Sequence, residues 1–272
     1  MSGTVDKVVS ADGTAIAFEK QGSGPAVVLV GGALMTRGAS AELAALLAGA
    51  FTVITYDRRG RGDSGDGPAY EVRREIEDID ALIEGPGGGS AMLFGMSSGA
   101  VLALEATARG SAVPRLALYE PPFITDGSRP PLPADYVAHL TELIGREEHG
   151  EAVAYFMEAA VGVPGEMIEG MRQAPFWADM AAVAPTLPYD GRVMGDTMSG
   201  RPLPVERWAS VTVPVLVGSG DAGDPHMLTG ARELAATGDN FTLRVFPGEE
   251  HNIPAQALAP VLTAFFGGDH AK

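Results

Sequence analysis

Short apolar runs alternate with helix-forming segments along most of this 272-residue chain, and this alternation restricts the folds that it can adopt. Residues 26–30 are almost continuously aliphatic, which is typical of a strand buried on both faces of a parallel sheet. Residues 70–83 carry aliphatic side chains at helical spacing along one face. Strands that alternate with helices predict an α/β fold, with a mostly parallel central sheet flanked by helices. Further strands are predicted at residues 5–10, 14–19, 51–56, 90–94, 115–119, 213–218 and 242–246, and further helices at residues 39–48, 100–109, 227–236 and 255–266.

The alternation of strands and helices stops between residues 125 and 208. Predicted helices follow one another there, separated by prolines and glycines, at residues 134–144, 151–161, 166–173 and 176–184. Strands resume after residue 208. We therefore expect a helical cap at residues 125–208, inserted into a core made of residues 1–124 and 209–272.

The charge and cysteine content exclude several classes of function. With 35 acidic and 19 basic side chains, the formal net charge is −16, so we expect neither nucleic acid nor an anionic membrane as a partner. No apolar run is long enough to span a membrane, and the first ten residues lack the apolar core of a secretion signal. The chain has no cysteine, which excludes disulfides and a cysteine nucleophile. We expect a cytoplasmic enzyme that needs no metal or other cofactor.

One serine stands in a pattern typical of a nucleophile. Ser97 has Gly95 two residues before it and Gly99 two residues after it. An apolar run at residues 90–94 precedes the segment, and a helix-forming run at residues 100–109 follows it. A serine at such a sharp strand-to-helix turn displays its hydroxyl at the end of the sheet, near the positive end of the following helix. The pattern predicts that Ser97 is a catalytic nucleophile.

A serine nucleophile needs a base to take its proton and a carboxylate to orient that base. In a parallel sheet, groups that must meet lie at the carboxyl ends of strands. Asp221 follows the strand at residues 213–218, and His251 is the one histidine that follows a predicted strand. We therefore expect Ser97, Asp221 and His251 to form a catalytic triad. Glu120, which ends the strand at residues 115–119, is the alternative acid.

Four further segments resemble conserved parts of the α/β-hydrolase fold superfamily. They are Asp12–Phe18, which is similar to its amino-terminal hairpin; Tyr56–Ser64, similar to a characteristic loop; Val213–Asp221, similar to the acid strand; and Gly248–His251, similar to the histidine loop. The resemblance covers essentially the whole chain. It implies that Ser97 attacks, that His251 acts as general base and then acid, and that Asp221 holds the tautomer of His251.

The resemblance also implies where the oxyanion of the reaction would bind. We assign its donors to the backbone amides of Ala33 and Ser98. The loop that usually reads His-Gly in such proteins is Val30-Gly31-Gly32-Ala33-Leu34 here, but backbone donors do not require the histidine. The hydroxyl of Ser98 is expected to point into the start of the helix. Arg58, Arg59 and Arg61, together with Asp57, are interpreted as a structural network.

The predicted function is that of a serine hydrolase that cleaves a carboxylic ester, lactone or thioester of a small apolar substrate through an acyl-enzyme. Methionines and aromatic residues of the predicted cap favour an apolar acyl pocket, although they also suit packing within the cap. These residues are Phe156, Met157, Met167, Met171, Phe176, Trp177, Met180, Met194, Met198 and Trp208. Two alternatives remain: a cofactor-free haloperoxidase, lyase or carbon–carbon bond hydrolase on the same scaffold, and a non-catalytic ligand-binding protein.

Overall fold

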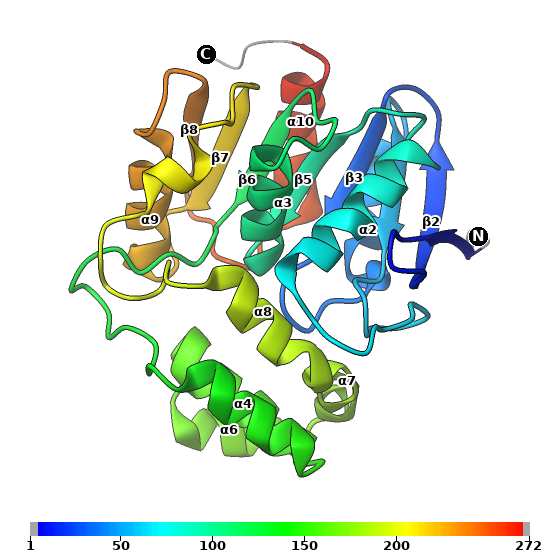
Figure 1. Ribbon diagram of the computed structural model, residues 1–272. Helices are drawn as coiled ribbons and strands as arrows, with labels where there is room; N and C mark the ends of the chain where they lie inside the picture. The colour runs from blue at the N-terminus through cyan, green and yellow to red at the C-terminus, as the bar shows by residue number, and fades with distance from the viewer. Residues whose placement is uncertain (1–4, 269–272) are drawn as a thin grey trace.

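An eight-stranded sheet forms the centre of the molecule in the computed structural model, which describes residues 5–268 (Figure 1). The strand order is β1-β2-β4-β3-β5-β6-β7-β8. Strands β3 to β8 are parallel, and the hairpin of β1 and β2 joins the sheet in antiparallel fashion through β4. This mostly parallel sheet confirms the predicted fold class. The strands are β1 (Asp6–Val9), β2 (Ala15–Gly22), β3 (Ala26–Val30), β4 (Thr52–Tyr56), β5 (Met92–Met96), β6 (Leu116–Tyr119), β7 (Val215–Gly220) and β8 (Phe241–Phe246).

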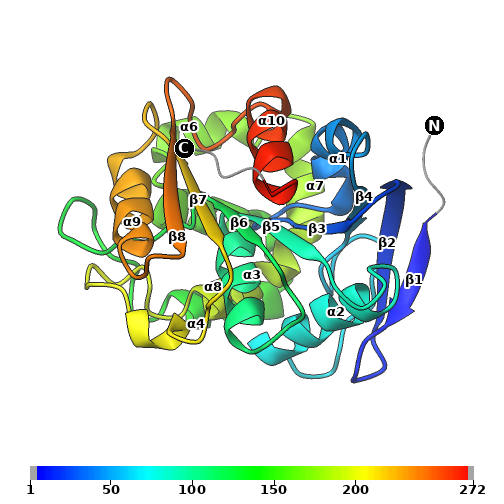
Figure 2. The same ribbon diagram turned by 90° about the horizontal axis from the view of Figure 1, so that it is seen from above.

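Helices cover both faces of the sheet, as Figure 2 shows from above. Helices α1 (Ala41–Leu47) and α10 (Ala255–Phe266) pack on one face. Helices α2 (Val72–Glu84), α3 (Ser98–Ala108) and α9 (Pro225–Ala235) pack on the other. Residues of β3 alternate between the two cores, because successive side chains of a strand point to opposite faces.

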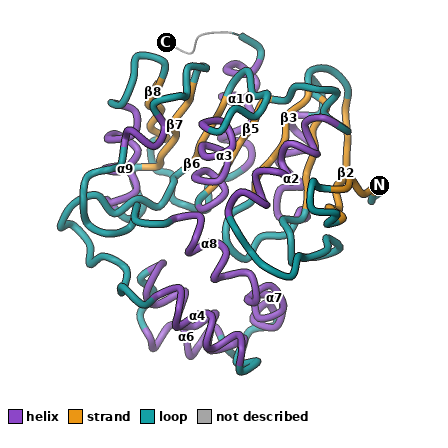
Figure 3. The backbone as a smooth tube through the Cα atoms, viewed as in Figure 1, coloured by secondary structure: helices purple, strands orange, loops and turns teal. Residues whose placement is uncertain are grey.

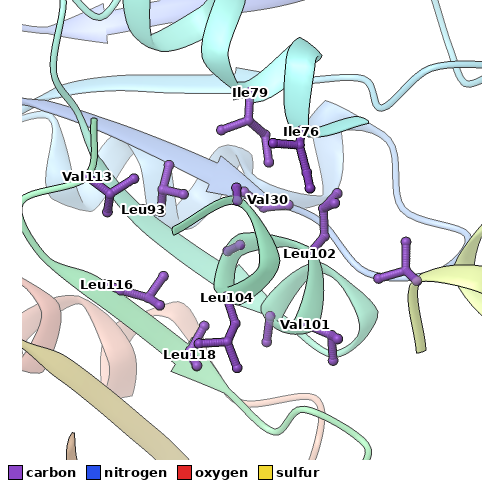
Figure 4. Packing of buried hydrophobic residues seen from close by; sticks show 14 of the residues in the cluster. Val30, Ile76, Ile79, Leu93, Val101, Leu102, Leu104, Val113, Leu116 and Leu118 are labelled. Atoms are coloured by element: carbon purple, nitrogen blue, oxygen red, sulfur yellow. The ribbon is translucent and has the colours of Figure 1, made fainter. Parts of the chain in front are cut away.

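Helix α3 is the most deeply buried helix of the core, and it carries the residue that follows Ser97. Its residues 98–106 are fully or almost fully buried. Figure 4 shows Val101, Leu102 and Leu104 packed among side chains of α2, β3, β5 and β6. A helix that is apolar over most of its surface must be covered on most sides. The start of α3 is therefore held firmly at the end of β5.

The chain between β6 and β7 is helical, and its helices lie beyond one end of the sheet (Figures 1 and 3). They are α4 (Tyr136–Gly145), α5 (His149–Phe156), a π-helical turn η2 (Met157–Val161), α6 (Gly165–Met171), α7 (Phe176–Val183) and α8 (Leu187–Met194). Short 3₁₀ segments are η1 (Arg37–Ser40), η3 (Ala184–Thr186) and η4 (Val205–Trp208). The helices around α4 to α7 share a small apolar core of their own. Their division from the rest of the chain at residues 125 and 208 stays a prediction.

Helix α8 is absent from the sequence-based assignment. Its first turn contains Pro188 and its centre contains Gly191, two residues that favour loops. Proline is tolerated in the first turn of a helix, because the amide that it lacks has no partner there. Gly191 is packed closely, since a Cβ built on it would lie 2.8 Å from the Val137 side chain. Tertiary packing of α8 on α3 and α4 thus outweighs its weak local preference.

Two short segments at the ends of the predicted core, residues 1–4 and 269–272, lie outside the described part of the chain. Between them, no helix has both the length and the apolar character that a membrane crossing requires.

Candidate active site

Ser97 occupies a sharp turn between β5 and α3. Its backbone φ is 57° and ψ is −130°, a conformation that residues other than glycine rarely adopt. Its amide donates to the Tyr119 carbonyl of β6 at 2.9 Å, which ties the turn to the sheet. The flanking positions have no room for a side chain. A Cβ on Gly95 would lie 2.6 Å from Ala100 Cα, and one on Gly99 would lie 2.5 Å from the Gly31 carbonyl oxygen. The sequence pattern around Ser97 therefore has a steric cause.

His251 and Glu120 form a close pair beside this turn. Nδ1 of His251 lies 2.7 Å from Oε2 of Glu120. The Glu120 side chain is 2% exposed, and its Oε1 accepts hydrogen bonds from the Gly220 amide at 2.9 Å and the Ser219 hydroxyl at 3.1 Å. Three contacts thus hold a buried carboxylate in one orientation, as an imidazole-orienting group requires.

The expectation that Asp221 orients His251 is wrong in this structure. The Asp221 carboxylate lies at the surface and accepts a hydrogen bond from the Gly248 amide at 2.7 Å. The cause lies in the length of β7, which continues to Gly220, two residues beyond the predicted end of the strand. The Gly220 amide donates its hydrogen bond to Glu120, and Asp221 is the first residue of the exposed loop that follows. The alternative that the sequence left open, Glu120 at the end of β6, is the residue that contacts the histidine.

Ser97, Glu120 and His251 all line one cavity of about 430 Å³. Most of its wall is apolar, including methionines from several elements. From the segment between β6 and β7 come Leu132, Phe156, Met157, Met180, Met194 and Met198, and from α9 comes Met227. The other residues that were predicted to line the pocket lie elsewhere. Met167 and Phe176 are exposed at the surface. Met171 and Trp177 pack in the small helical core, and Trp208 packs in the main core. Part of the set therefore lines the cavity and part packs within the protein, while Met167 and Phe176 do neither; an acyl group as the occupant of the cavity stays a prediction.

The loop after β3 lies directly against Ser97. A Cβ on Gly32 would be 2.9 Å from Ser97 Cβ, so only glycine fits there. Leu34 has a φ of 59°, and the Gly32 amide donates to the Met35 thioether at 3.1 Å. Among residues 5–268, the amides of Ala33 and Ser98 donate to no protein acceptor. Both residues line the cavity, which is the arrangement expected of oxyanion donors.

The Ser98 hydroxyl binds a buried carboxylate of another helix. It donates to Oδ1 of Asp190, a residue of α8, at 2.7 Å. Asp190 is buried and also pairs with Arg58 at 2.6 Å and Arg61 at 2.7 Å. Burial opposes its ionisation, but the two guanidinium groups outweigh burial, and the pKa of the Asp190 carboxyl is lowered. Sequence reasoning missed Asp190, because no local pattern distinguishes it in the segment 184–194.

The arginines of the loop after β4 form the structural network that was predicted. Arg59 pairs with Asp78 at 2.7 Å and with Asp12 at 2.9 Å, and Arg58 pairs with Glu75 at 2.6 Å. Asp57 pairs with Arg37. In the described part of the chain, no group of three or more histidine, aspartate or glutamate side chains is placed to hold a metal ion.

His226 is a further titratable group of the cavity wall. It is buried at the start of α9, and its Nδ1 lies 2.8 Å from Oδ1 of Asp224. Burial lowers the pKa of His226, although Asp224 opposes the shift. Burial therefore disfavours the protonated form of this imidazole.

Comparison with known proteins agrees with this architecture. A model of the alpha/beta hydrolase family matches residues 27–264. The crystal structure of an alpha/beta hydrolase from Sphaerobacter thermophilus is 52% identical, with a TM-score of 0.89 over 96% of this chain and 100% of that chain. A thermophilic esterase from Thermogutta terrifontis is 23% identical, with a TM-score of 0.72 over 99% of this chain and 100% of that one, a likeness of fold.

One curated relative, the uncharacterized hydrolase YraK of Bacillus subtilis, is 35% identical over 96 residues. The match covers 34% of this chain and 35% of YraK, so it spans about a third of that relative.

Proposed function

Because the chain belongs to the alpha/beta hydrolase family, we propose that it is a serine hydrolase acting on a carboxylic ester, lactone or thioester. The observation that carries the proposal is the shared cavity of Ser97 and the His251–Glu120 pair. A strained serine, a carboxylate-bound imidazole and two free amides on one cavity wall are the parts that acyl transfer needs.

In this proposal Glu120 takes the part of the triad acid. Its carboxylate accepts a hydrogen bond from Nδ1–H of His251, which keeps the proton on Nδ1 and leaves Nε2 free to take a proton from Ser97. The Ser97 oxygen then attacks the acyl carbon, and the amides of Ala33 and Ser98 stabilise the oxyanion. His251 returns its proton to the leaving alcohol or thiol. Water then gives a proton to His251 and attacks the acyl carbon, the carboxylic acid leaves, and His251 returns the proton to the Ser97 oxygen.

The apolar wall of the cavity favours a substrate whose acyl or alcohol group is apolar. Thioether side chains are flexible and polarizable, so a wall with seven methionines adapts to different apolar shapes. We infer a medium-sized substrate, because the volume of about 430 Å³ is that of a small-molecule site.

A fluorophosphonate probe tests the nucleophile, and an ester, thioester and lactone panel of graded acyl length tests the reaction. We expect the probe to modify the Ser97 peptide in the wild-type protein and to leave Ser97→Ala unmodified. Hydrolysis in Ser97→Ala is expected to fall by about 10⁴-fold or more. The control is Ser210→Ala, whose exposed hydroxyl bonds only the Ala108 carbonyl and should not affect either readout. A protein that neither reacts with the probe nor cleaves any member of the panel would contradict the proposal.

A further inference from the structure

A cluster of buried charges adjoins the cavity of Ser97, and Asp190 of this cluster is part of the cavity wall. Arg58, Arg61, Glu75 and Asp190 have side chains that are 2%, 1%, 2% and 6% exposed. Asp190 is at the centre, since one oxygen accepts from Arg58 and Ser98 and the other accepts from Arg61. All of these groups are paired, so the cluster is complete.

Stability alone does not account for such a cluster. Removing two opposite charges from water costs several kcal/mol per ion, and their attraction often does no more than offset that cost. Apolar side chains of similar volume generally serve a core as well. The hydrogen bonds from this cluster to the backbone near Ser97 suggest a second role, which is to orient that backbone.

Arg61 orients the loop that carries Ala33. Its Nη1 donates to the Gly32 carbonyl at 2.6 Å and to the Met35 carbonyl at 3.2 Å. A trans peptide is planar, so the carbonyl of Gly32 and the amide of Ala33 point in opposite directions. Holding the carbonyl against buried Arg61 thus turns the Ala33 amide away from it. The guanidinium is itself fixed, because Nη2 donates to Asp190 and Nε donates to Thr186.

Asp190 also holds the residue that carries the second amide. Ser98 follows the nucleophile, and its hydroxyl donates to Asp190 at 2.7 Å. This bond anchors the first residue of α3, whose amide has no acceptor within the helix. One carboxylate therefore reaches Ser98 directly and Ala33 through Arg61.

We infer that Asp190 is a positioning residue that holds the two oxyanion amides, those of Ala33 and Ser98, in register. The inference rests on the proposed function. Because Asp190 belongs to α8, a helix from the segment between β6 and β7, the oxyanion site forms only when α8 is docked on α3. The helices over the cavity thus supply part of the catalytic geometry as well as the walls.

Asp190→Asn tests this role, with Asp78→Asn as the matched control. Both changes neutralise a buried aspartate paired with an arginine of the same loop, but Asp78 contacts Arg59, which bonds none of residues 31–35. For Asp190→Asn we expect kcat to fall by about 10²-fold, the loss typical of one oxyanion donor, with KM changed by less than about threefold. Asp78→Asn should retain the wild-type kcat per folded molecule, counted by fluorophosphonate titration.

A transition-state analogue separates positioning from general damage. A trifluoromethyl ketone forms a hemiketal: the Ser97 oxygen bonds to the carbonyl carbon, His251 takes the proton, and the carbonyl oxygen becomes the oxyanion. We expect its affinity to fall in Asp190→Asn by the same factor as kcat/KM. Unchanged analogue affinity, or an equal loss in Asp78→Asn, would overturn the inference.

A second variant guards against misfolding of Asp190→Asn. Ser98→Ala removes one hydroxyl and keeps the ion pairs, and we expect about a tenfold loss of kcat. In the double variant the two losses should not add, because both act through the same contact. Additive losses would contradict a shared role.

Amide hydrogen exchange gives a readout that needs no substrate. We expect faster exchange at residues 32–35 in Asp190→Asn than in the wild-type protein or Asp78→Asn. If the wild-type protein cleaves no substrate, the proposed function fails, and exchange still decides whether Asp190 orders the loop. Identical exchange in all three proteins would overturn the inference.

Discussion

Backbone strain is concentrated at the candidate site. Four residues other than glycine have a positive φ among residues 5–268, namely Leu34, Ser97, Glu120 and Glu147. The first three line the same cavity. Such conformations cost of the order of 1–3 kcal/mol each and persist only where the surroundings impose them. Here the surroundings are the sheet, α3 and the buried contacts of Glu120, so the strain is held at the residues that the proposed reaction uses.

The choice of acid gives a sharp prediction at this scale. Glu120→Gln keeps the shape of the side chain but loses the charge that orients and stabilises the imidazolium, so we expect kcat to fall by about 10⁴-fold. Asp221→Asn should retain activity within about twofold, because that carboxylate contacts only the Gly248 amide at the surface. Steady-state hydrolysis of one ester by both purified variants makes the comparison. A larger loss for Asp221→Asn would restore the original assignment.

At the scale of elements, the tight junction of β3, β5 and α3 sets the position of Ser97. Gly99 lies so close to the carbonyls of Val30 and Gly31 that the start of α3 and the loop after β3 are in direct backbone contact. No side chain fits between the start of α3 and this loop, so a shift of one would move the other. The position of Ser97 therefore depends on the position of the loop that carries Ala33. This is why small residues dominate where β5 meets α3.

Gly99→Ala is predicted to disturb both stability and activity. The new Cβ would lie 2.5 Å from the Gly31 carbonyl oxygen, so the loop must shift. We expect a loss of about 1–3 kcal/mol in the free energy of unfolding, typical of overpacking, together with reduced kcat. Urea unfolding and ester hydrolysis measure the two effects. Gly170→Ala is the control: it lies within α6 with open space around it, and it should be neutral or stabilising by about 1 kcal/mol. Equal behaviour of the two variants would contradict the steric argument.

At the scale of the whole molecule, two kinds of electrostatics coexist. The buried pairs around Asp190 and Asp78 are shielded from solvent, whereas the net charge of −16 is spread mainly over exposed acidic side chains. Like charges on a surface repel one another, and salt screens this repulsion over about 10 Å at 0.1 M ionic strength. Buried pairs are screened much less.

We therefore predict that salt stabilises the protein. Raising sodium chloride from about 10 mM to about 0.3 M should increase Tm, because screening relieves the surface repulsion and leaves the buried pairs nearly unaffected. Thermal unfolding followed by circular dichroism measures the change. A fall of Tm with salt would mean that exposed ion pairs, such as those of Arg73 and Arg172, outweigh the repulsion.

Local patterns in the chain were enough to predict the sheet, most of the helices and the turn at Ser97. Each rests on residues close in sequence: an aliphatic run, a helical period, or a glycine two positions from a serine. The contact between Glu120 and His251 joins residues 131 apart, and those of Asp190 with Arg58 and Arg61 join residues 132 and 129 apart. No local pattern distinguishes Glu120 from Asp221, because both follow neighbouring strands. The extra length of β7 and the docking of α8 on α3 decided these contacts, and both arise from packing between distant segments.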